Sequence, residues 1–524
     1  MLITEILSRN ARMYGSKTAL IERTPAIGRR VEITWKTFDD QANQVAQALM
    51  KRGIQKGDRV VLLMMNCIEW LPIYFGILRT GAWAVPLNFR FVAETIQRCV
   101  AVAEAKAFIF GEEFIGRVEK IQPDLKNIVK NFIFVGPEEH CPEYTEYFEK
   151  IIETEAPAAP DVHIDILDDA ALYFTSGTTG NPKATLLTHR NLEFACFTEN
   201  RHHNQTHEDN FLCIPPLYHT GAKMHWFGNF IVGAKAVILK GIEPRWIVEA
   251  ISEEKITIVW LLVPWALDIL FAIENKDIKL ENYDLDQWRL MHIGAQPVPP
   301  SLIREWKKIF PHHQYDTNYG LTETTGPGCV HLGMENMHKV GAIGVPGFDW
   351  EFKIVDNNRI PLPLKEIGEL MVKGPGVMKA YYKNPEATRE TLFDGWLLTG
   401  DMAKVDEDGF IWLVDRKKDV IITGGENIYP VDIEDFLQSH PKIQDVAVIG
   451  LPSLRLGEIA AAIIKVKPGQ ELQAKEVEDF CMELPRYKRP RRIIFGDVPR
   501  NPTGKIEKPK LRKEYAGAKE SFKL

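Results

Sequence analysis

The sequence lacks any pair of cysteines at the spacing of a metal site. Its seven cysteines lie at positions 67, 99, 141, 196, 213, 329 and 481, and none approaches C-x-x-C. Thiols so far apart are typical of a protein in a reducing compartment without a structural zinc ion. The first fifteen residues mix acidic and basic side chains and contain no apolar core of a secretory signal, so we expect a cytoplasmic protein.

Long uninterrupted apolar runs are also absent. The longest candidate, residues 256–271, is broken by Pro264 and Asp268, and it falls short of the roughly 18 to 20 apolar residues that a membrane span needs. We therefore expect a buried strand followed by a helix there, and no integral membrane association. The net charge of −7 gives no reason to expect nucleic acid as a partner.

The pattern that is present is one of alternating helices and strands. Helices of about ten residues alternate with short Val/Ile/Leu runs to about residue 350, which favours layered α/β sheets buried on both faces. Near the start, Thr37 is expected to cap a helix that ends at Gly53. A strand over 60–64 and a helix over 68–78 are expected to follow.

A change of charge near residue 415 divides the chain. From Arg416 onward there are 21 Lys and Arg against 16 Asp and Glu, which leaves 43 against 55 in residues 1–415. We predict a large layered α/β N-terminal domain over 1–415 and a small, mobile α+β domain over 416–524. The five basic residues of segment 486–492 form either a solvated face or a phosphate-binding surface.

The stretch 171–183, ALYFTSGTTGNPK, predicts a buried strand that runs into a glycine-bent loop. Such a loop can wrap an anion, because its glycines let backbone N–H groups converge, its hydroxyls add donors and a lysine follows. It is not a Walker loop, since G-x-x-x-x-G-K-[ST] is absent. A plain surface turn has the same composition and remains the alternative.

Two further stretches carry groups that suit a nucleotide. In residues 318–324, NYGLTET, an aromatic ring can stack on a purine, an amide can bind its exocyclic amine, and a hydroxyl beside a carboxylate offers oxygen ligands to Mg²⁺. Residues 396–401, WLLTGD, end an apolar run with a carboxylate that can accept from both hydroxyls of a ribose. By contrast, Lys505 in a Pro/Gly-rich turn would, on its own, be a surface lysine.

Together these stretches resemble, in the right order and over about residues 170 to 510, the acyl-adenylate-forming (AMP-dependent) synthetase family. Within that family they resemble the acyl-CoA synthetases most. One departure is Ala184, where the family usually has glycine after the lysine. The resemblance implies an AMP-forming carboxylic acid:CoA ligase that uses ATP, Mg²⁺ and coenzyme A. The alternatives are an acyl-AMP ligase that loads a carrier protein, or a nucleotide-binding regulator on the same fold, against which the intact Lys505, Glu323 and Asp401 argue.

The resemblance also implies roles for single residues. Lys505, Lys183, Glu323 and Thr322 would be catalytic, Glu323 and Thr178 would hold the metal, and Lys418 would be the hinge between the domains. In acyl-CoA synthetases the glycines that match Gly424 and Gly425 border the tunnel for pantetheine. The full set expected to bind nucleotide or CoA is Thr175, Ser176, Gly177, Thr178, Thr179, Gly180, Gly294, Ala295, Gln296, Asn318, Tyr319, Gly320, Asp401, Arg416, Gly424, Gly425 and Lys488.

The acid pocket would be lined by His219, Ala222, Lys223 and Leu321. The alternative for His219 is that its ring only packs within its own loop and does not line the acid pocket. Lys223 either faces the pocket, where it would block a long chain or pair with a polar group of the acid, or turns outward to solvent. The outward position is favoured, because lysine is almost never buried unpaired. We expect a medium-chain, alicyclic or aromatic acid as the small-molecule partner, and the oligomeric state is left open, a homodimer being one option.

Overall fold

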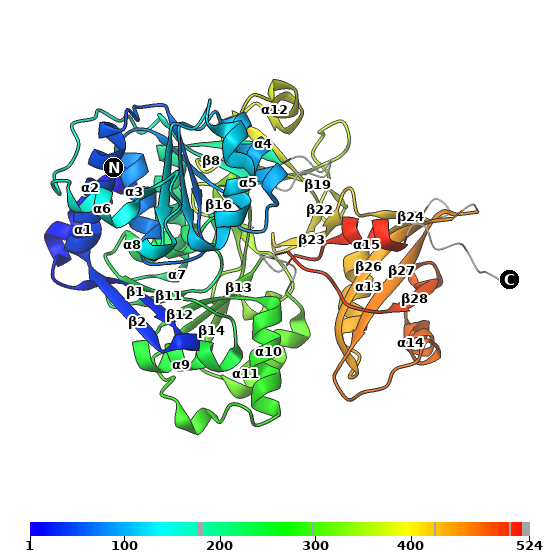
Figure 1. Ribbon diagram of the computed structural model, residues 1–524. Helices are drawn as coiled ribbons and strands as arrows, with labels where there is room; N and C mark the ends of the chain where they lie inside the picture. The colour runs from blue at the N-terminus through cyan, green and yellow to red at the C-terminus, as the bar shows by residue number, and fades with distance from the viewer. Residues whose placement is uncertain (176–181, 296–297, 424–425, 454, 502–504, 516–524) are drawn as a thin grey trace.

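The structure is a computed structural model that describes residues 1–175, 182–295, 298–423, 426–453, 455–501 and 505–515. It is a mixed α/β protein with layered sheets, as predicted. A large body, blue to yellow in Figure 1, carries most of the chain, and a smaller orange-to-red unit lies beside it. All seven cysteines are free.

The first large sheet carries the strand before the predicted phosphate loop. Its eight strands run in the order β20-β9-β8-β4-β3-β5-β6-β7, and β8 and β9 form an antiparallel hairpin. The central strands are apolar and buried, because helices cover both faces of the sheet. The strands are β20 (Ala380–Tyr381), β9 (Lys183–Thr188), β8 (Asp169–Thr175), β4 (Trp83–Pro86), β3 (Arg59–Leu63), β5 (Ala107–Gly111), β6 (Asn131–Val135) and β7 (Glu146–Tyr147).

The second large sheet has seven strands in the order β14-β13-β12-β10-β11-β1-β2, and all but the β1–β2 pair are parallel. The apolar run at 256–271 supplies β12 and the helix α10 (Val263–Glu274), so the prediction of a strand followed by a helix is confirmed. The strands are β14 (Gln314–Asp316), β13 (Leu290–Gly294), β12 (Ile258–Leu262), β10 (Asn210–Cys213), β11 (Lys235–Leu239), β1 (Thr18–Thr24) and β2 (Arg29–Thr34).

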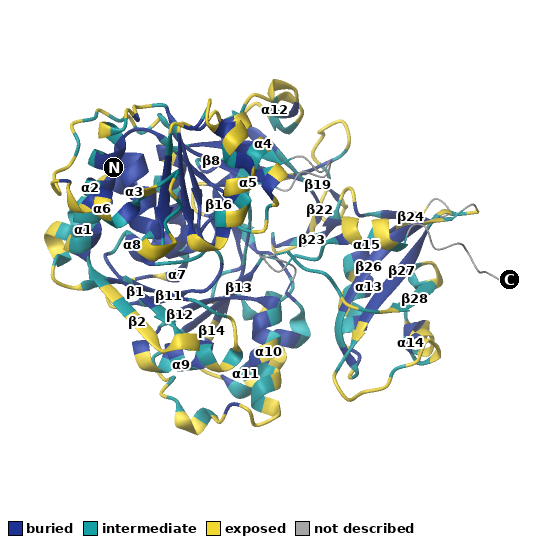
Figure 2. Cartoon of the chain, in the orientation of Figure 1, coloured by how far each residue is buried: buried dark blue, intermediate teal, exposed yellow. Residues whose placement is uncertain are grey.

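Helices pack on both large sheets, with their exposed faces outward and the strands buried between them (Figure 2). Among the described residues no helix is both long and apolar enough to cross a bilayer. The helices of the body are α1 (Ile3–Tyr14), α2 (Trp35–Lys51), α3 (Trp70–Arg79), α4 (Ala93–Ala103), α5 (Ile115–Leu125), α6 (Phe148–Glu153), α7 (His189–His203), α8 (Thr220–Phe230), α9 (Pro244–Glu254), α10, α11 (Pro300–Ile309) and α12 (Pro385–Thr391).

Helix α2 begins earlier than predicted. Thr34, in extended conformation, accepts a hydrogen bond from the backbone N–H of Thr37 at 3.1 Å, so Thr34 is the cap and Thr37 lies in the first turn. The prediction of Thr37 as the cap is wrong: two threonines that can cap a helix stand three residues apart, and the helix begins at the buried Trp35, after the first of them.

The body also contains two smaller sheets. One contains β15 (Asn318–Leu321), β16 (Gly326–His331) and β17 (Val345–Pro346). The other contains β18 (Glu351–Val355), β19 (Gly368–Lys373), β22 (Trp396–Val405) and β21 (Leu392–Phe393), with β23 (Ile411–Arg416) on β22.

The C-terminal unit has its own sheet and its own core. The sheet runs β25-β24-β27-β26, with β28 on β27, and two apolar clusters fill its faces. Its elements are β24 (Ile421–Thr423), β25 (Glu426–Ile428), α13 (Pro430–Gln438), β26 (Ile443–Ser453), β27 (Gly457–Val466), α14 (Ala474–Phe480), β28 (Arg492–Phe495) and α15 (Lys508–Tyr515).

Candidate active site

The β8–β9 hairpin positions the two ends of the predicted phosphate loop. Thr175, the last residue of β8, lies opposite Lys183, the first residue of β9. The strand predicted at 171–174 is confirmed. The loop residues Ser176, Gly177, Thr178, Thr179 and Gly180 lie outside the described residues.

Tyr381 joins Lys183 to Glu323. Strand β20 pairs with β9, which places the ring of Tyr381 4.8 Å from Lys183 Nζ. The Tyr381 hydroxyl donates to Glu323 Oε1 at 2.8 Å. Burial and the nearby Glu323 carboxylate raise the pKa of Tyr381, so its hydroxyl stays protonated and remains a donor. Tyr381 was not predicted, because its role depends on a pairing between segments almost two hundred residues apart.

Asp401 lies at the centre of the predicted nucleotide residues. Strands β22 and β23 place it opposite Arg416, whose Nε lies 2.8 Å from Asp401 Oδ1. Tyr319, from β15, donates its hydroxyl to the other carboxylate oxygen at 2.5 Å. Three residues from three separate motifs are thus brought together, and the Asp401 charge raises the pKa of Arg416.

Lys505 lies within electrostatic range of this group. Burial lowers the pKa of Lys505 to about 8, and the charge of Arg416 acts in the same direction, whereas Asp401 and Glu323 act in the opposite one. Its backbone N–H donates to Asn501 Oδ1 at 2.9 Å, which fixes the base of the turn. The Asp401 and Glu323 carboxylates of the body therefore act electrostatically on the lysine of the C-terminal unit.

The remaining predicted nucleotide residues lie at strand ends nearby. Gly294 ends β13, and a Cβ added there would lie 3.8 Å from Trp260 Nε1 and 3.9 Å from the carbonyl oxygen of Asn318. Ala295 follows with a left-handed φ of 69°. Asn318 and Gly320 belong to β15, Thr322 begins the short helix 322–324, and Gln296 lies outside the described residues.

The start of helix α8 carries the predicted acid-pocket residues. His219 caps the helix, its Nδ1 accepting from the N–H of Gly221 at 3.1 Å. Burial, followed by the charges of Lys505 and Lys223, lowers the pKa of His219 to about 3, so this imidazole is neutral. Ala222 is buried and Leu321 is half-buried.

Lys223 is buried, and the prediction that it turns outward is wrong. Its side chain is 0% exposed, and its Nζ has no hydrogen-bond partner among the described residues. The ammonium faces three aromatic rings, at 4.7 Å from Tyr173, 5.0 Å from Tyr74 and 5.8 Å from Trp70. Burial lowers its pKa to about 7. Every residue of α8 is buried, so this helix has no solvent side on which a lysine could lie.

The structure describes two of the four predicted residues discussed next, all of which follow strand β23. Lys418 is exposed in the turn between β23 and β24, and Lys488 Nζ lies 2.5 Å from Asp432. Gly424 and Gly425 lie outside the described residues.

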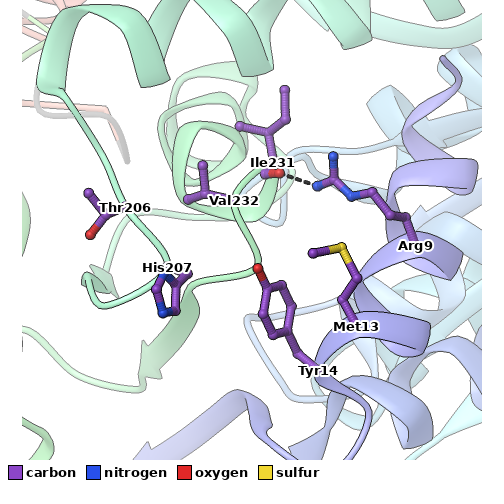
Figure 3. A pocket seen from close by; sticks show the side chains of 7 residues that line it. All are labelled: Arg9, Met13, Tyr14, Thr206, His207, Ile231 and Val232. Carbon is purple, nitrogen blue, oxygen red and sulfur yellow. Dashed lines mark hydrogen bonds between the residues drawn. The ribbon is translucent and has the colours of Figure 1, made fainter.

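A shallow surface pocket of about 360 Å³ lies between α1 and the segments 206–207 and 231–232 (Figure 3). Arg9 donates to the carbonyl oxygen of Ile231 at its rim. None of its lining residues belongs to the predicted site.

The candidate active site is the group of residues that includes Asp401, Glu323 and Lys505.

Comparison with known proteins gives the same result for the chain as a whole. Residues 7–382 match the family described as AMP-binding enzyme, and residues 432–505 match the AMP-binding enzyme C-terminal domain. The long-chain-fatty-acid–CoA ligase FadD13 of Mycobacterium tuberculosis is 31% identical over 93% of this chain and 94% of that protein. An anthranilate CoA ligase, AuaEII, in complex with anthranoyl-AMP superposes with a TM-score of 0.89 at 27% identity, covering 98% of this chain and 97% of that one. ATP-bound MatB from Rhodopseudomonas palustris gives 0.87 at 26% identity, covering 99% of both chains.

The chain belongs to the AMP-binding enzyme family. It is an AMP-forming acid–thiol ligase, an acyl-CoA synthetase in class, and enzymes of this class use ATP, Mg²⁺ and coenzyme A.

Proposed function

We propose that this enzyme activates a carboxylic acid of limited length as its acyl-adenylate and then transfers the acyl group to the thiol of CoA. A free carboxylate resists attack because it is an anion and would have to expel oxide, whereas a mixed anhydride with AMP releases a phosphate monoester. Joining a carboxylate to a triphosphate requires positive charge rather than an acid–base pair. The observation that supports this most is that Asp401 contacts Arg416 and Tyr319 and, together with Glu323, acts electrostatically on Lys505.

Each residue of this group is assigned to one part of the nucleotide. Asn318 and Tyr319 bind adenine, Asp401 and Arg416 bind ribose, and Thr322 and Lys183 bind phosphate oxygens. Glu323, with a loop hydroxyl such as Thr178, would hold Mg²⁺, which neutralises triphosphate charge when bound. The donor set fits, since one Glu323 oxygen accepts from Tyr381 while the other accepts no hydrogen bond from any described residue.

The two steps require different groups at one carbon atom. We assign residues 1–415 and 416–524 to two domains that turn about Lys418, so that Lys505 serves adenylation and Gly424–Gly425 then serves the thiol route. The acceptor is free CoA rather than a carrier protein, because the basic segment 486–492 suits its phosphates. The seven free thiols support a cytoplasmic location.

The basic segment is tested by its two exposed arginines. Lys488 is paired with Asp432 and Arg489 donates to backbone carbonyls, which leaves Arg486 and Arg491 exposed. Replacing both with glutamine is expected to raise the KM for CoA about three- to tenfold with little change for ATP, because phosphate contacts are lost. Added salt should reduce the difference in the KM for CoA between the parent and the variant.

The matched control replaces Lys510 and Lys513, which are exposed on α15 of the same domain. It removes the same charge and should leave the KM for CoA unchanged. If the control moves that constant as much as the arginine variant does, or if neither moves it, segment 486–492 is only a solvated face.

Lys223 limits the length and the polarity of the acid that can bind. Its ammonium lies in the acid-pocket helix four residues after His219, and its charge reaches that histidine. A cation caged by Trp70, Tyr74 and Tyr173, without a hydrogen-bond acceptor, is poorly compensated for its lost hydration. A medium-chain, alicyclic or aromatic acid with an acceptor at its far end would supply that acceptor, while a long apolar chain would meet the ammonium.

Replacing Lys223 with methionine, which keeps the unbranched stem, tests this substrate class. The parent is expected to prefer 4-hydroxybenzoate over benzoate and 6-hydroxyhexanoate over hexanoate. The variant is expected to shift kcat/KM toward longer apolar acids by about 1 to 3 kcal/mol, the usual size of a pocket contact. The measurement is AMP release across the acid panel.

Lys235→Met, a half-buried lysine of β11, controls for the loss of a lysine as such. An unchanged preference profile in Lys223→Met, or efficient use of long-chain acids by the parent, would contradict this assignment of the substrate class.

A further inference from the structure

Asn318 is held from behind by two buried groups. Its side-chain nitrogen donates to Glu199 Oε1 at 3.0 Å and lies 3.1 Å from His225 Nε2. Glu199, on α7, is 0% exposed, and His225, on α8, is 3% exposed. Asn318 itself is only half-buried.

Glu199 belongs to a closed ring of two carboxylates and two imidazoles. His203 directs Nδ1 toward Glu199 at 3.4 Å and Nε2 toward Asp316 at 2.8 Å. His331 directs Nε2 toward Glu199 at 3.4 Å and Nδ1 toward Asp316 at 3.3 Å. All four side chains are buried. Each imidazole therefore lies between the same two carboxylates.

The ring keeps Glu199 ionised inside the core. Burial alone would raise the pKa of Glu199, but the surrounding imidazoles of His225, His331 and His203 lower it well below its ordinary range. A carboxylate has no proton to donate. Glu199 therefore only accepts hydrogen bonds, and it must face the N–H side of the Asn318 amide.

The same ring contains ligand atoms close enough to hold a cation, in the group His203, Asp316 and His331. The shortest contact of the ring runs from His203 Nε2 to Asp316 at 2.8 Å, and the contacts of His203 and His331 with Glu199, both at 3.4 Å, are ion-pair distances.

His225 lies against the same nitrogen of Asn318. Its Nδ1 lies against the backbone carbonyl of Gly221, which can only accept, so Nδ1 carries a proton. Its Nε2 lies 3.1 Å from the Asn318 side-chain nitrogen and 3.1 Å from His292 Nε2. Because Glu199 can only accept, the nitrogen of the Asn318 amide faces it and the carbonyl oxygen Oδ1 is turned away.

We propose that Glu199 is a positioning residue that fixes Asn318 with its carbonyl oxygen toward the nucleotide and thereby selects adenine as the base. The exocyclic amine of adenine donates to that oxygen, whereas O6 of hypoxanthine or guanine is an acceptor and would repel it. This inference rests on the adenine-binding role given to Asn318 in the proposed function.

The test compares ATP with ITP in acid-dependent pyrophosphate release. The parent is expected to prefer ATP by at least about 100-fold in kcat/KM, because a mismatched polar pair is strongly rejected. In Glu199→Gln the new amide offers a donor as well as an acceptor, so the side-chain amide of Asn318 can rotate and exchange the positions of its oxygen and nitrogen. The ATP-to-ITP ratio is then expected to fall about tenfold or more, an effect that a merely structural carboxylate would not have.

A swapped variant provides the second arm. In Glu199→Gln with Asn318→Asp the glutamine amide donates to one aspartate oxygen and leaves the other as an acceptor toward the base, with the net charge unchanged. We expect the ATP preference to return to within about threefold of the parent's. An unchanged ratio in the single variant, or no recovery in the swap, would overturn the inference.

If Glu199→Gln does not fold, the swap decides alone, since retention of the ATP preference supports the inference and its loss contradicts it. A parent that releases no pyrophosphate from ATP with any acid would instead count against the proposed function.

Discussion

Alanine in place of Lys505 is expected to slow acyl-AMP formation from free acid and ATP by about 10² to 10³-fold, the usual cost of losing one charge aimed at an anionic transition state. Lys505 is the cation of the C-terminal unit on which the charges of Asp401 and Glu323 act. In the domain exchange proposed above, the lysine leaves before the thiol arrives. Thioester formation from preformed acyl-AMP should therefore remain within about tenfold of the parent's rate.

The two half-reactions are measured separately, as pyrophosphate release and as CoA-dependent consumption of synthetic acyl-AMP. Lys510→Ala, an exposed lysine on α15, is the control and should change neither. Since the pKa of Lys505 is lowered to about 8, adenylation by the parent should decline as the pH rises through 8, and Lys505→Arg should remove that decline. Equal losses in both half-reactions of Lys505→Ala would contradict the domain exchange.

Methionine in place of Lys223 is expected to stabilise the protein. The pKa of Lys223 is lowered from 10.5 to about 7, and at about 1.4 kcal/mol per unit this corresponds to about 5 kcal/mol of unfavourable burial near neutral pH. Attraction to the three aromatic rings offsets part of it. We expect a net gain of about 2 to 4 kcal/mol, measured as a higher Tm, together with loss of the polar-acid preference.

The sign of the pH dependence tests the same point. Between pH 7 and 10.5 the unfolded chain keeps the Lys223 proton that the folded chain has released, so this group makes the free energy of unfolding rise with pH. The advantage of Lys223→Met should therefore be largest at or below pH 7 and shrink toward pH 10. A variant that is less stable than its parent at pH 7 would show that the ammonium is well compensated.

The residues proposed to bind the nucleotide could be identified in the sequence because their motifs are contiguous. Asn318, Tyr319 and Glu323 lie within six residues of one another, so their chemistry could be recognised before the fold was known. Strands before and after them were also predictable from apolar runs of the correct length. The error at the start of α2 arose because two threonines three residues apart are equally good caps on local grounds.

Residues that act across the fold could not be predicted in this way. Glu199 has a local partner in His203, four residues later on α7, but its other partners, Asn318 and His331, lie more than a hundred residues further along the chain. Lys223 was misplaced for a related reason. The rarity of buried lysine is an average over helices with a solvent side, and α8 has none.

The central claim is that the acid becomes a mixed anhydride with AMP before CoA attacks. Its most direct test uses carboxylic acids labelled with ¹⁸O in both carboxyl oxygens, supplied with ATP and CoA, followed by mass spectrometry of the products. Attack of the carboxylate on the α-phosphate and later release of AMP transfers one labelled oxygen to AMP. The account predicts AMP with a single ¹⁸O, one per thioester formed. Unlabelled AMP, or formation of ADP with the label in inorganic phosphate, would contradict it.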